Sequence, residues 1–123
     1  MAQSILVADD EPSILLSLQV LLQKAGYEVR VARDGQEVLD ALREATPDLI
    51  VLDAMMPVFS GYDICEMLRA EPNLYHIPII MLTAKGRDTD REKGMALGAT
   101  DYITKPFSTR EFVETVRRQI GAP

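Results

Sequence analysis

The sequence has very little of several residue types that mark particular protein classes. Its 123 residues include one cysteine, one histidine and no tryptophan. A single cysteine excludes an internal disulfide. Cys65 falls in a helical pattern beside Ile64, Met67 and Leu68, so we interpret it as a packing residue.

Long apolar runs and an excess of basic residues are also missing. No stretch approaches the ~18 to 20 apolar residues that cross a bilayer, and no apolar segment follows a basic N-terminal region. We therefore expect a cytoplasmic protein. The chain has 13 basic and 19 acidic residues, for a formal charge of −6. This charge disfavours nucleic acid and anionic membranes as direct partners and suits cations or basic protein surfaces.

The sequence does contain an alternation of short apolar runs and amphipathic segments. The runs predict buried parallel strands, and apolar residues three and four apart predict helices. The expected strands are 5–8, 29–31, 49–52, 79–82 and 102–104, and the expected helices are 12–25, 34–46, 62–71, 88–97 and 108–120. Residues 1–123 are thus predicted to form one α/β domain, a doubly wound five-stranded parallel sheet flanked by five helices.

Several helix boundaries carry their own signals. Pro12 suits a first helical turn and Gly26 a helix stop, and Ser108 with Glu111 predicts a capping box. The segment 88–97 has the weakest apolar stripe, which predicts a loosely held helix that can shift.

Polar residues stand where four of the apolar runs end: Asp9 with Asp10, then Asp53, Thr83 and Lys105. In an open α/β sheet, ligands bind outside the carboxyl ends of the strands. We therefore expect these side chains to converge on one crevice. Each residue alone has an ordinary alternative, because an acid pair is often a solvated turn, a lysine a surface charge and a threonine a strand residue. The combination is what predicts a site.

Three converging carboxylates predict a divalent cation. Negative charges packed within a few ångströms repel each other unless protons or a cation compensate. Oxygen ligands without a nearby histidine or cysteine favour Mg²⁺ over zinc, and we expect Mn²⁺ to substitute. A metal beside a carboxylate supports phosphoryl transfer through an aspartyl phosphate, so Asp53 is the expected nucleophile. A lysine ammonium and a threonine hydroxyl would contact its phosphoryl oxygens.

Four motifs, in order and over almost the whole chain, resemble the response-regulator receiver domain of two-component signalling. They are V-A-D-D-E-P at 7–12, L-D-A-M-M-P at 52–57 with Gly61, M-L-T-A at 81–84 and D-Y-I-T-K-P-F at 101–107. The resemblance implies a flavodoxin-like fold with strand order 2-1-3-4-5. It makes the protein a phosphorylation-dependent switch rather than an enzyme with a separate substrate.

The resemblance also assigns roles to the residues around the metal. It makes Asp53 the phosphoacceptor, Asp10 a direct Mg²⁺ ligand, Asp9 a ligand through water, and the backbone carbonyl of Met55 a further ligand. Met55 and Lys85 flank the acceptor and are expected to tune hydrolysis of the phosphoryl group.

A second set of roles concerns the phosphoryl group and the response to it. The resemblance implies that Lys105 grips the phosphoryl group, that Thr83 swings toward it, and that Tyr102 turns inward behind Thr83. Ala84 leaves room for the group and offers a backbone N–H. The Lys105–Pro106 peptide is expected to be cis.

The implied partners are a sensor histidine kinase or phosphotransfer protein and a downstream target or attached output domain. The chain has no glycine-rich nucleotide loop, so the phosphoryl group would come from a phosphohistidine on the partner. His76 lies in the loop before Pro78, away from the expected site, and is not that histidine. The output surface would be the fourth helix, fifth strand and fifth helix, with Arg87, Arg91, Lys93, Asp101, Glu111 and Arg118.

Three other functions fit parts of this pattern less well. A phosphohydrolase with an aspartyl intermediate usually has a second acid two residues after its nucleophile, where this chain has Met55. A flavodoxin-like cofactor binder would need a phosphate loop, but Asp9 and Asp10 would repel phosphate. A receiver-like docking module without phosphorylation is disfavoured because no expected site residue is missing. Receivers that dimerise through the output surface typically have an acid and an arginine where this chain has Thr100 and Thr115, so we leave its oligomeric state open.

Overall fold

Five short, mostly aliphatic strands pair in parallel and form the centre of the molecule. The computed structural model describes residues 3–84 and 88–122. The strands are β1 (Ser4–Ala8), β2 (Glu28–Ala32), β3 (Leu49–Asp53), β4 (Ile79–Ala84) and β5 (Asp101–Lys105), in the order β2-β1-β3-β4-β5. Every residue of β3 is buried, whereas the edge strand β2 is mostly half-exposed or exposed. The predicted sheet and its implied strand order are confirmed.

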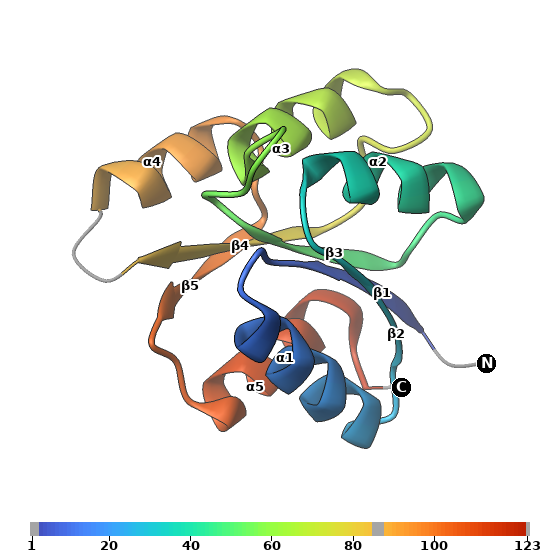
Figure 1. Ribbon diagram of the computed structural model, residues 1–123, viewed down its shortest axis with the longest axis vertical. Helices are drawn as coiled ribbons and strands as arrows, with labels where there is room; N and C mark the ends of the chain where they lie inside the picture. Colours follow the sequence, from blue (N-terminus) through green and yellow to red (C-terminus); the bar gives the residue numbers. More distant parts are fainter. Residues whose placement is uncertain (1–2, 85–87, 123) are drawn as a thin grey trace.

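Helices cover both faces of this sheet, as expected for right-handed crossovers between parallel strands. They are α1 (Pro12–Lys24), α2 (Gly35–Glu44), α3 (Gly61–Ala70), α4 (Asp88–Ala96) and α5 (Thr109–Ile120). In Figure 1, α1 and α5 lie below the sheet, and α2, α3 and α4 lie above it. The strand order reverses beside β1 and β3, and this switch point is where ligand sites form in such sheets.

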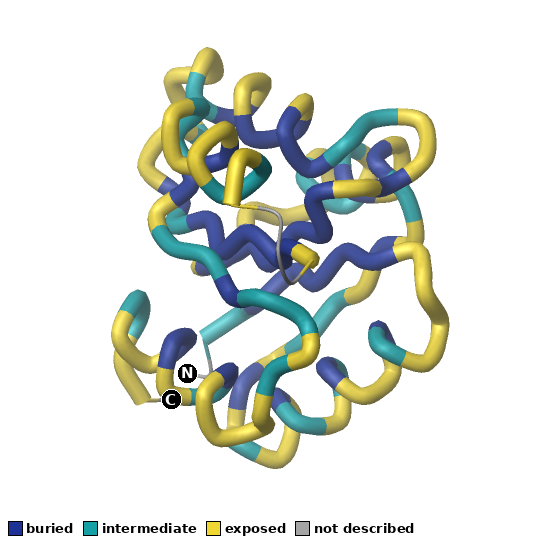
Figure 2. The backbone as a smooth tube through the Cα atoms, turned by 90° about the vertical axis from the view of Figure 1, so that its left-hand side faces the viewer, coloured by how far each residue is buried: buried dark blue, intermediate teal, exposed yellow. Residues whose placement is uncertain are grey.

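The two layers of helices enclose two separate apolar cores. The core under α1 and α5 includes Leu18 and Phe112, and the core under α2, α3 and α4 includes Ile64 and Met81. Figure 2 shows the buried strands between helices whose outer sides are exposed. Within the described part of the chain, no helix combines the length and the apolar character required to cross a membrane.

The local signals for helix ends are confirmed, with two differences. Pro12 begins α1, Gly26 follows it with a φ of 102°, and the Ser108 hydroxyl accepts a hydrogen bond from the Glu111 N–H. A capping box with both reciprocal hydrogen bonds occurs instead at Ser60 and Asp63, at the start of α3. The helix predicted over 88–97 ends one residue earlier, at Ala96.

Gly61 connects α3 to the strand end that carries Asp53. Its N–H donates to the Ala54 carbonyl, and a Cβ at this position would lie 2.4 Å from the Asp53 carbonyl oxygen. No side chain fits in that space, because real Cβ contacts do not approach 3.0 Å. Gly61 therefore allows α3 to begin directly against the backbone of Asp53.

Helix α4 is held differently from the other helices. Its only buried residue is Gly94, so it has little apolar surface in the core. The Tyr62 hydroxyl of α3 donates to the Asp90 carbonyl at 3.2 Å, and Lys93 lies 4.5 Å over the Tyr62 ring. On its other side, Arg91 donates to the hydroxyl of Tyr102 in β5. Polar and aromatic contacts thus replace the usual apolar stripe.

Candidate functional site

The carboxyl ends of β1, β3, β4 and β5 bring the predicted polar residues to one edge of the sheet. Asp53 ends β3, Lys105 ends β5, and Asp9 directly follows β1. The register aligns Ala84 with Lys105 and places Asp53 beside Leu82 of β4. The parallel pairing therefore gathers residues that are about 100 positions apart in the sequence.

Three aspartates form an acidic cluster at this edge. Asp9, Asp10 and Asp53 each offer a carboxylate oxygen, and these oxygens all lie within 4.8 Å of one another. Asp9 is fully buried, Asp53 is 7% exposed, and Asp10 is exposed. Two of the charges are thus held away from bulk water, which strengthens their mutual repulsion.

The Lys105 ammonium lies between the two buried carboxylates. Its Nζ is 2.9 Å from Oδ2 of Asp9 and 3.5 Å from Oδ1 of Asp53. The other oxygen of Asp9 accepts a hydrogen bond from the Glu11 N–H, and Oδ1 of Asp53 accepts one from the Met55 N–H. Asp9 is therefore fixed by contacts to both of its oxygens.

The electrostatics of the cluster appear in the pKa values of Asp53 and Lys105. Burial and the neighbouring Asp9 carboxylate raise the pKa of Asp53 to about 6, against the opposing effects of Lys105 and the Met55 N–H. Burial lowers the pKa of Lys105, but its hydrogen bond to Asp9 and the nearby carboxylates outweigh this and raise it overall. One ammonium thus compensates only part of the negative charge.

A cleft of about 270 Å³ opens above the cluster. Its walls include Asp10, Asp53, Met55, Ala84 and Lys105, all of which were predicted site residues. Thr83 is buried in β4 directly before Ala84, with 3% exposure. The expected residue Lys85 lies outside the described residues.

Four further residues line this cleft to which sequence reasoning gave no role in the site: Glu11, Ala54, Leu82 and Asp90. Leu82 contributes apolar surface next to Asp53, and Asp90 of α4 reaches the cleft from the side. Asp90 lies seven residues after Thr83, in a segment with several other acids. Nothing in the sequence distinguishes it from an ordinary solvent-exposed acid in the first turn of a helix. Its position brings α4 into the wall of the site.

Tyr102 lies beside α4 and is half-buried. Its hydroxyl accepts a hydrogen bond from Nη1 of Arg91 at 2.9 Å, and the guanidinium carbon is 4.9 Å from the ring centroid. The family resemblance implied that Tyr102 is a switch residue and Arg91 part of the output surface, whereas the residues alone favoured plain strand packing for Tyr102. Their direct contact was not predicted.

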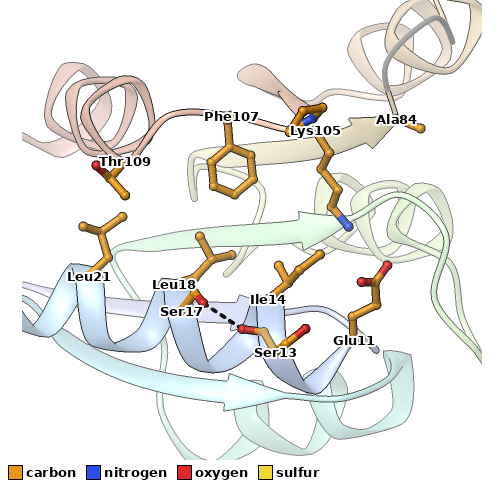
Figure 3. Close-up of a pocket in the computed structure, with 11 residues that line it drawn as sticks. Glu11, Ser13, Ile14, Ser17, Leu18, Leu21, Ala84, Lys105, Phe107 and Thr109 are labelled. Carbon is orange, nitrogen blue, oxygen red and sulfur yellow. Dashed lines mark hydrogen bonds between the residues drawn. The ribbon is translucent and has the colours of Figure 1, made fainter.

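A larger apolar groove of about 560 Å³ adjoins the cleft on the side of α1. Figure 3 shows Ile14, Leu18 and Leu21 pointing toward Phe107 across it, with Lys105 and Glu11 at one end. Lys105, Glu11 and Ala84 line both hollows. The chain bends into α5 beyond the Lys105–Pro106 peptide, which is cis as expected.

The acidic cluster fits a hard divalent cation. All three side chains supply oxygen, and their spacing allows one ion to contact more than one of them. Burial first, and then the negative charge of Asp9, raises the pKa of Asp53, and a cation would offset that negative charge. Chemically, the same arrangement places a partly buried carboxylate nucleophile beside an ammonium that can pair with an incoming anion.

Comparisons with known proteins agree with this geometry. The family model of the response regulator receiver domain matches residues 5–117. The alkaline phosphatase synthesis transcriptional regulatory protein PhoP of Bacillus subtilis is 46% identical over 128 residues, covering 100% of this chain and 52% of PhoP. The chain thus spans about half the length of this relative.

Solved structures show the same fold. The receiver domain of sensor histidine kinase PA1611 from Pseudomonas aeruginosa has a TM-score of 0.89 at 33% identity, covering 99% of this chain and 100% of that one. That structure has a magnesium ion coordinated in its active site cleft. The chemotaxis response regulator CheY4 of Vibrio cholerae has a TM-score of 0.91 at 34% identity, covering 98% and 100%.

Receivers accept a phosphoryl group, bind Mg²⁺ at an acidic site and interact with histidine kinases or phosphotransfer proteins. The four motifs, the strand order, the acidic cluster and the family match all lead to the same conclusion. The chain belongs to the family of response regulator receiver domains.

Proposed function

We propose that Asp53 is the phosphoacceptor of a receiver switch formed by residues 1–123. The single observation that carries this proposal is the position of Asp53, a strand-end carboxylate beside two further aspartates and 3.5 Å from the Lys105 ammonium. Within the cluster, the Asp53 carboxylate is mostly buried, yet it still lines the cleft.

Asp10, Asp53 and the Met55 carbonyl are the proposed direct ligands of Mg²⁺, and Asp9 acts through water. The contacts of Asp9 support its indirect role, because Lys105 and the Glu11 N–H already engage its two oxygens. Asp10 is exposed and lines the cleft, which suits direct ligation. When bound, the cation supplies neutralisation of the negative charge that acceptor and phosphoryl group share. We expect Mn²⁺ to substitute, because it accepts the same oxygen ligands.

Transfer would begin with the ionised Asp53 carboxylate at the cleft. One of its oxygens attacks phosphorus, the bond from phosphorus to the donor histidine nitrogen breaks, and that imidazole leaves with a proton from solvent. Lys105 pairs with the transferred oxygens, and the Ala84 N–H and Thr83 hydroxyl donate to them. Water later hydrolyses the acyl phosphate, which releases inorganic phosphate and restores the carboxylate. Met55 at the rim, 59% exposed, is positioned to limit that water.

The proposed signal travels from Thr83 to α4 through Tyr102. Phosphorylation adds about −1.5 to −2 charge and new hydrogen-bond acceptors. Movement of Thr83 toward them opens space that the Tyr102 ring takes, and this movement breaks the hydrogen bond with Arg91. The output surface is α4, β5 and α5, with Arg91, Lys93, Asp101, Glu111 and Arg118. Arg87, also expected there, lies outside the described residues.

The proposed phosphodonor is a sensor histidine kinase or phosphotransfer protein. The recipient is either a separate protein or an attached output domain, as the transcriptional role and greater length of the relative suggest. We do not expect direct contact of these residues with nucleic acid or membrane. The cytoplasmic location remains a prediction, and the domain is proposed to be a switch that catalyses only its own phosphorylation and dephosphorylation.

Phosphorylation by a small donor tests the proposal. Acetyl phosphate with Mg²⁺ should add one phosphoryl group, measured as intact mass, and the label should be lost at alkaline pH as expected for an acyl phosphate. The Asp53→Asn variant should gain none, while Asp48→Asn, a matched change away from the cleft, should label normally. Unreduced labelling of Asp53→Asn would falsify the assignment of the acceptor. Omission of the metal should abolish labelling, and Mn²⁺ should restore it.

A further inference from the structure

The cleft beside Asp53 is lined by more acids than its proposed chemistry uses. Its described charged lining residues are four acids and one base: Asp10, Glu11, Asp53, Asp90 and Lys105. Asp53 and Asp10 have proposed roles as acceptor and metal ligand, and Glu11 directly precedes the well-buried helix α1. Among these described residues, Asp90 alone comes from α4, the helix that buries only Gly94. It is half-buried, so its charge is partly held away from water.

Acids are common in the first turn of a helix, because they interact favourably with the N–H groups exposed there. Asp88 and Asp90 both lie in the first turn of α4, so this ordinary role applies to each of them. Of the two, only Asp90 also lines the cleft. The pair therefore allows a general effect of helix-start acids to be separated from an effect of charge inside the cleft.

Asp90 is close enough to the reaction centre for its charge to act there. The cleft has a volume of about 270 Å³. A hollow of this volume is roughly 8 Å across if it is treated as a sphere, which is about the screening length of physiological salt solution. Its walls are protein rather than water, so charges across the cleft interact more strongly than they would across the same distance of solvent. We therefore expect Asp90 to repel an anion that enters.

Phosphorylation changes the charge balance of the cleft. With a divalent cation bound, the positive charges of the cation and Lys105 together match the negative charges of the three clustered aspartates. Transfer replaces the Asp53 carboxylate with a phosphoryl group that carries about −1.5 to −2 charge. The cluster then has an excess of about half to one negative charge, and Asp90 of α4 lies in the wall of the same cleft.

We propose that Asp90 is a charge sensor, whose carboxylate opposes entry of the phosphoryl anion and, after transfer, is repelled from the cleft together with the first turn of α4. The inference rests on the proposed function and adds a through-space route to the one through Thr83 and Tyr102. The attachment of this turn can yield, because the hydrogen bond from the Tyr62 hydroxyl to the Asp90 carbonyl is long, at 3.2 Å. Repulsion at Asp90 thus acts on the residue that this bond holds.

The rate of labelling by acetyl phosphate with Mg²⁺, followed as intact mass, tests the first half of the proposal. At ~20 mM ionic strength, Asp90→Asn should be labelled about three- to tenfold faster than the wild type, because one charge that opposes the anion is gone. This ratio should fall toward one in ~0.5 M salt. Asp88→Asn, the matched change in the same helical turn, should stay within about twofold of the wild type, as should Asp90→Glu, which keeps the charge.

Two results of this experiment overturn the proposal. Equal rates in Asp90→Asn and Asp88→Asn would make Asp90 an ordinary helix-start acid. A slower rate in Asp90→Asn would mean that Asp90 helps to hold the cation. Absence of label from the wild type overturns the proposed function and this inference together, whereas normal labelling of the wild type with equal rates in the two variants overturns this inference alone. Circular dichroism checks that the variants are folded.

Hydrogen exchange of the α4 amides tests the second half of the proposal. Phosphorylation by acetyl phosphate should raise their exchange rates in the wild type, and this rise should be smaller in Asp90→Asn but unchanged in Asp88→Asn. Thr83→Ala removes the hydroxyl of the other route, so part of the rise should remain there and should disappear when Asp90→Asn is added. An equal rise in Asp90→Asn and the wild type, or complete loss of the rise in Thr83→Ala alone, overturns the proposed displacement of α4.

Discussion

Helices α1 and α4 cover opposite faces of the same sheet but are attached to it in opposite ways. Three leucines of α1 are buried in the core, whereas α4 buries only Gly94 and is held by Tyr62 and Tyr102 through Arg91, Lys93 and a backbone carbonyl. Apolar packing has many near-equivalent contacts and resists displacement, while a few directional contacts can be exchanged one by one. The comparison teaches that α1 is built to stay in place and α4 to move.

The largest expected effect on stability comes from a substitution that weakens the packing of α1 in the core. Leu18→Ala removes a side chain that is 1% exposed and should lower the free energy of unfolding by about 2 to 5 kcal/mol. The matched change in α4, Met95→Ala, removes a side chain that is 41% exposed and should change it by less than about 0.5 kcal/mol. Urea denaturation of both variants makes the measurement, and similar losses would contradict the distinction between the two helices.

The next effect is on the pH dependence of stability and concerns the acidic cluster of Asp9, Asp10 and Asp53. Asp53 has a pKa of about 6 in the folded state and 3.8 as its ordinary value, so the folded state binds the proton more strongly. The contribution of Asp53 to metal-free stability should therefore be fully present below about pH 4 and be lost as the pH rises through about 6. Asp53→Asn should lack this decline and be more stable than the wild type at pH 7. Parallel pH profiles for the two proteins would refute the explanation.

Addition of Mg²⁺ at pH 7 is the companion test. It should raise the stability of the wild type, because a cation bound only to the folded state stabilises it by mass action. Mg²⁺ should raise the stability of the Asp53→Asn variant by a smaller amount. An equal gain would show that the ion binds elsewhere.

A smaller effect should come from the contact between Arg91 and Tyr102. Arg91→Ala should lower the free energy of unfolding by about 0.5 to 1.5 kcal/mol. It should also raise the hydrogen-exchange rates of α4 amides much more than those of α1 amides. Tyr102→Phe should reproduce part of this change, because it removes the hydroxyl and keeps the ring. Arg110→Ala in α5 is the control, since Arg110 pairs with Glu114 on an exposed surface. Uniform protection across all four proteins would mean that the contact does not hold α4.

The smallest effect is expected at Lys93. Lys93→Met keeps an unbranched side chain over the Tyr62 ring and removes the charge that lies 4.5 Å from its centroid. The loss should be about 0.5 to 1 kcal/mol and should vanish in a Tyr62→Leu background. A double-mutant cycle in urea measures the coupling between the two residues, and additive losses would argue against it.

The sequence predicted the fold and the central residues of the site for a definite reason. Buried parallel strands have a simple signature, and Asp53 and Lys105 follow such strands directly, so their meeting is a consequence of sheet topology. The relation of α4 to the rest could not be predicted in the same way. Its contacts with Tyr62 and Tyr102 connect α4 to α3 and β5, and no sequence pattern indicates that these elements meet. The acidic residues at the start of α4 have the same sequence pattern whether they face water or the cleft.

The close approach at Gly61 has a consequence for mutational scans of this protein. Any side chain there would press on the peptide that carries Asp53, so a defect in packing and a defect in phosphorylation would arise together. Variants at residue 61 should therefore score like variants at residue 53, although residue 61 carries no reactive group. In this domain, a position that a genetic screen identifies as a signalling residue can act through steric fit alone.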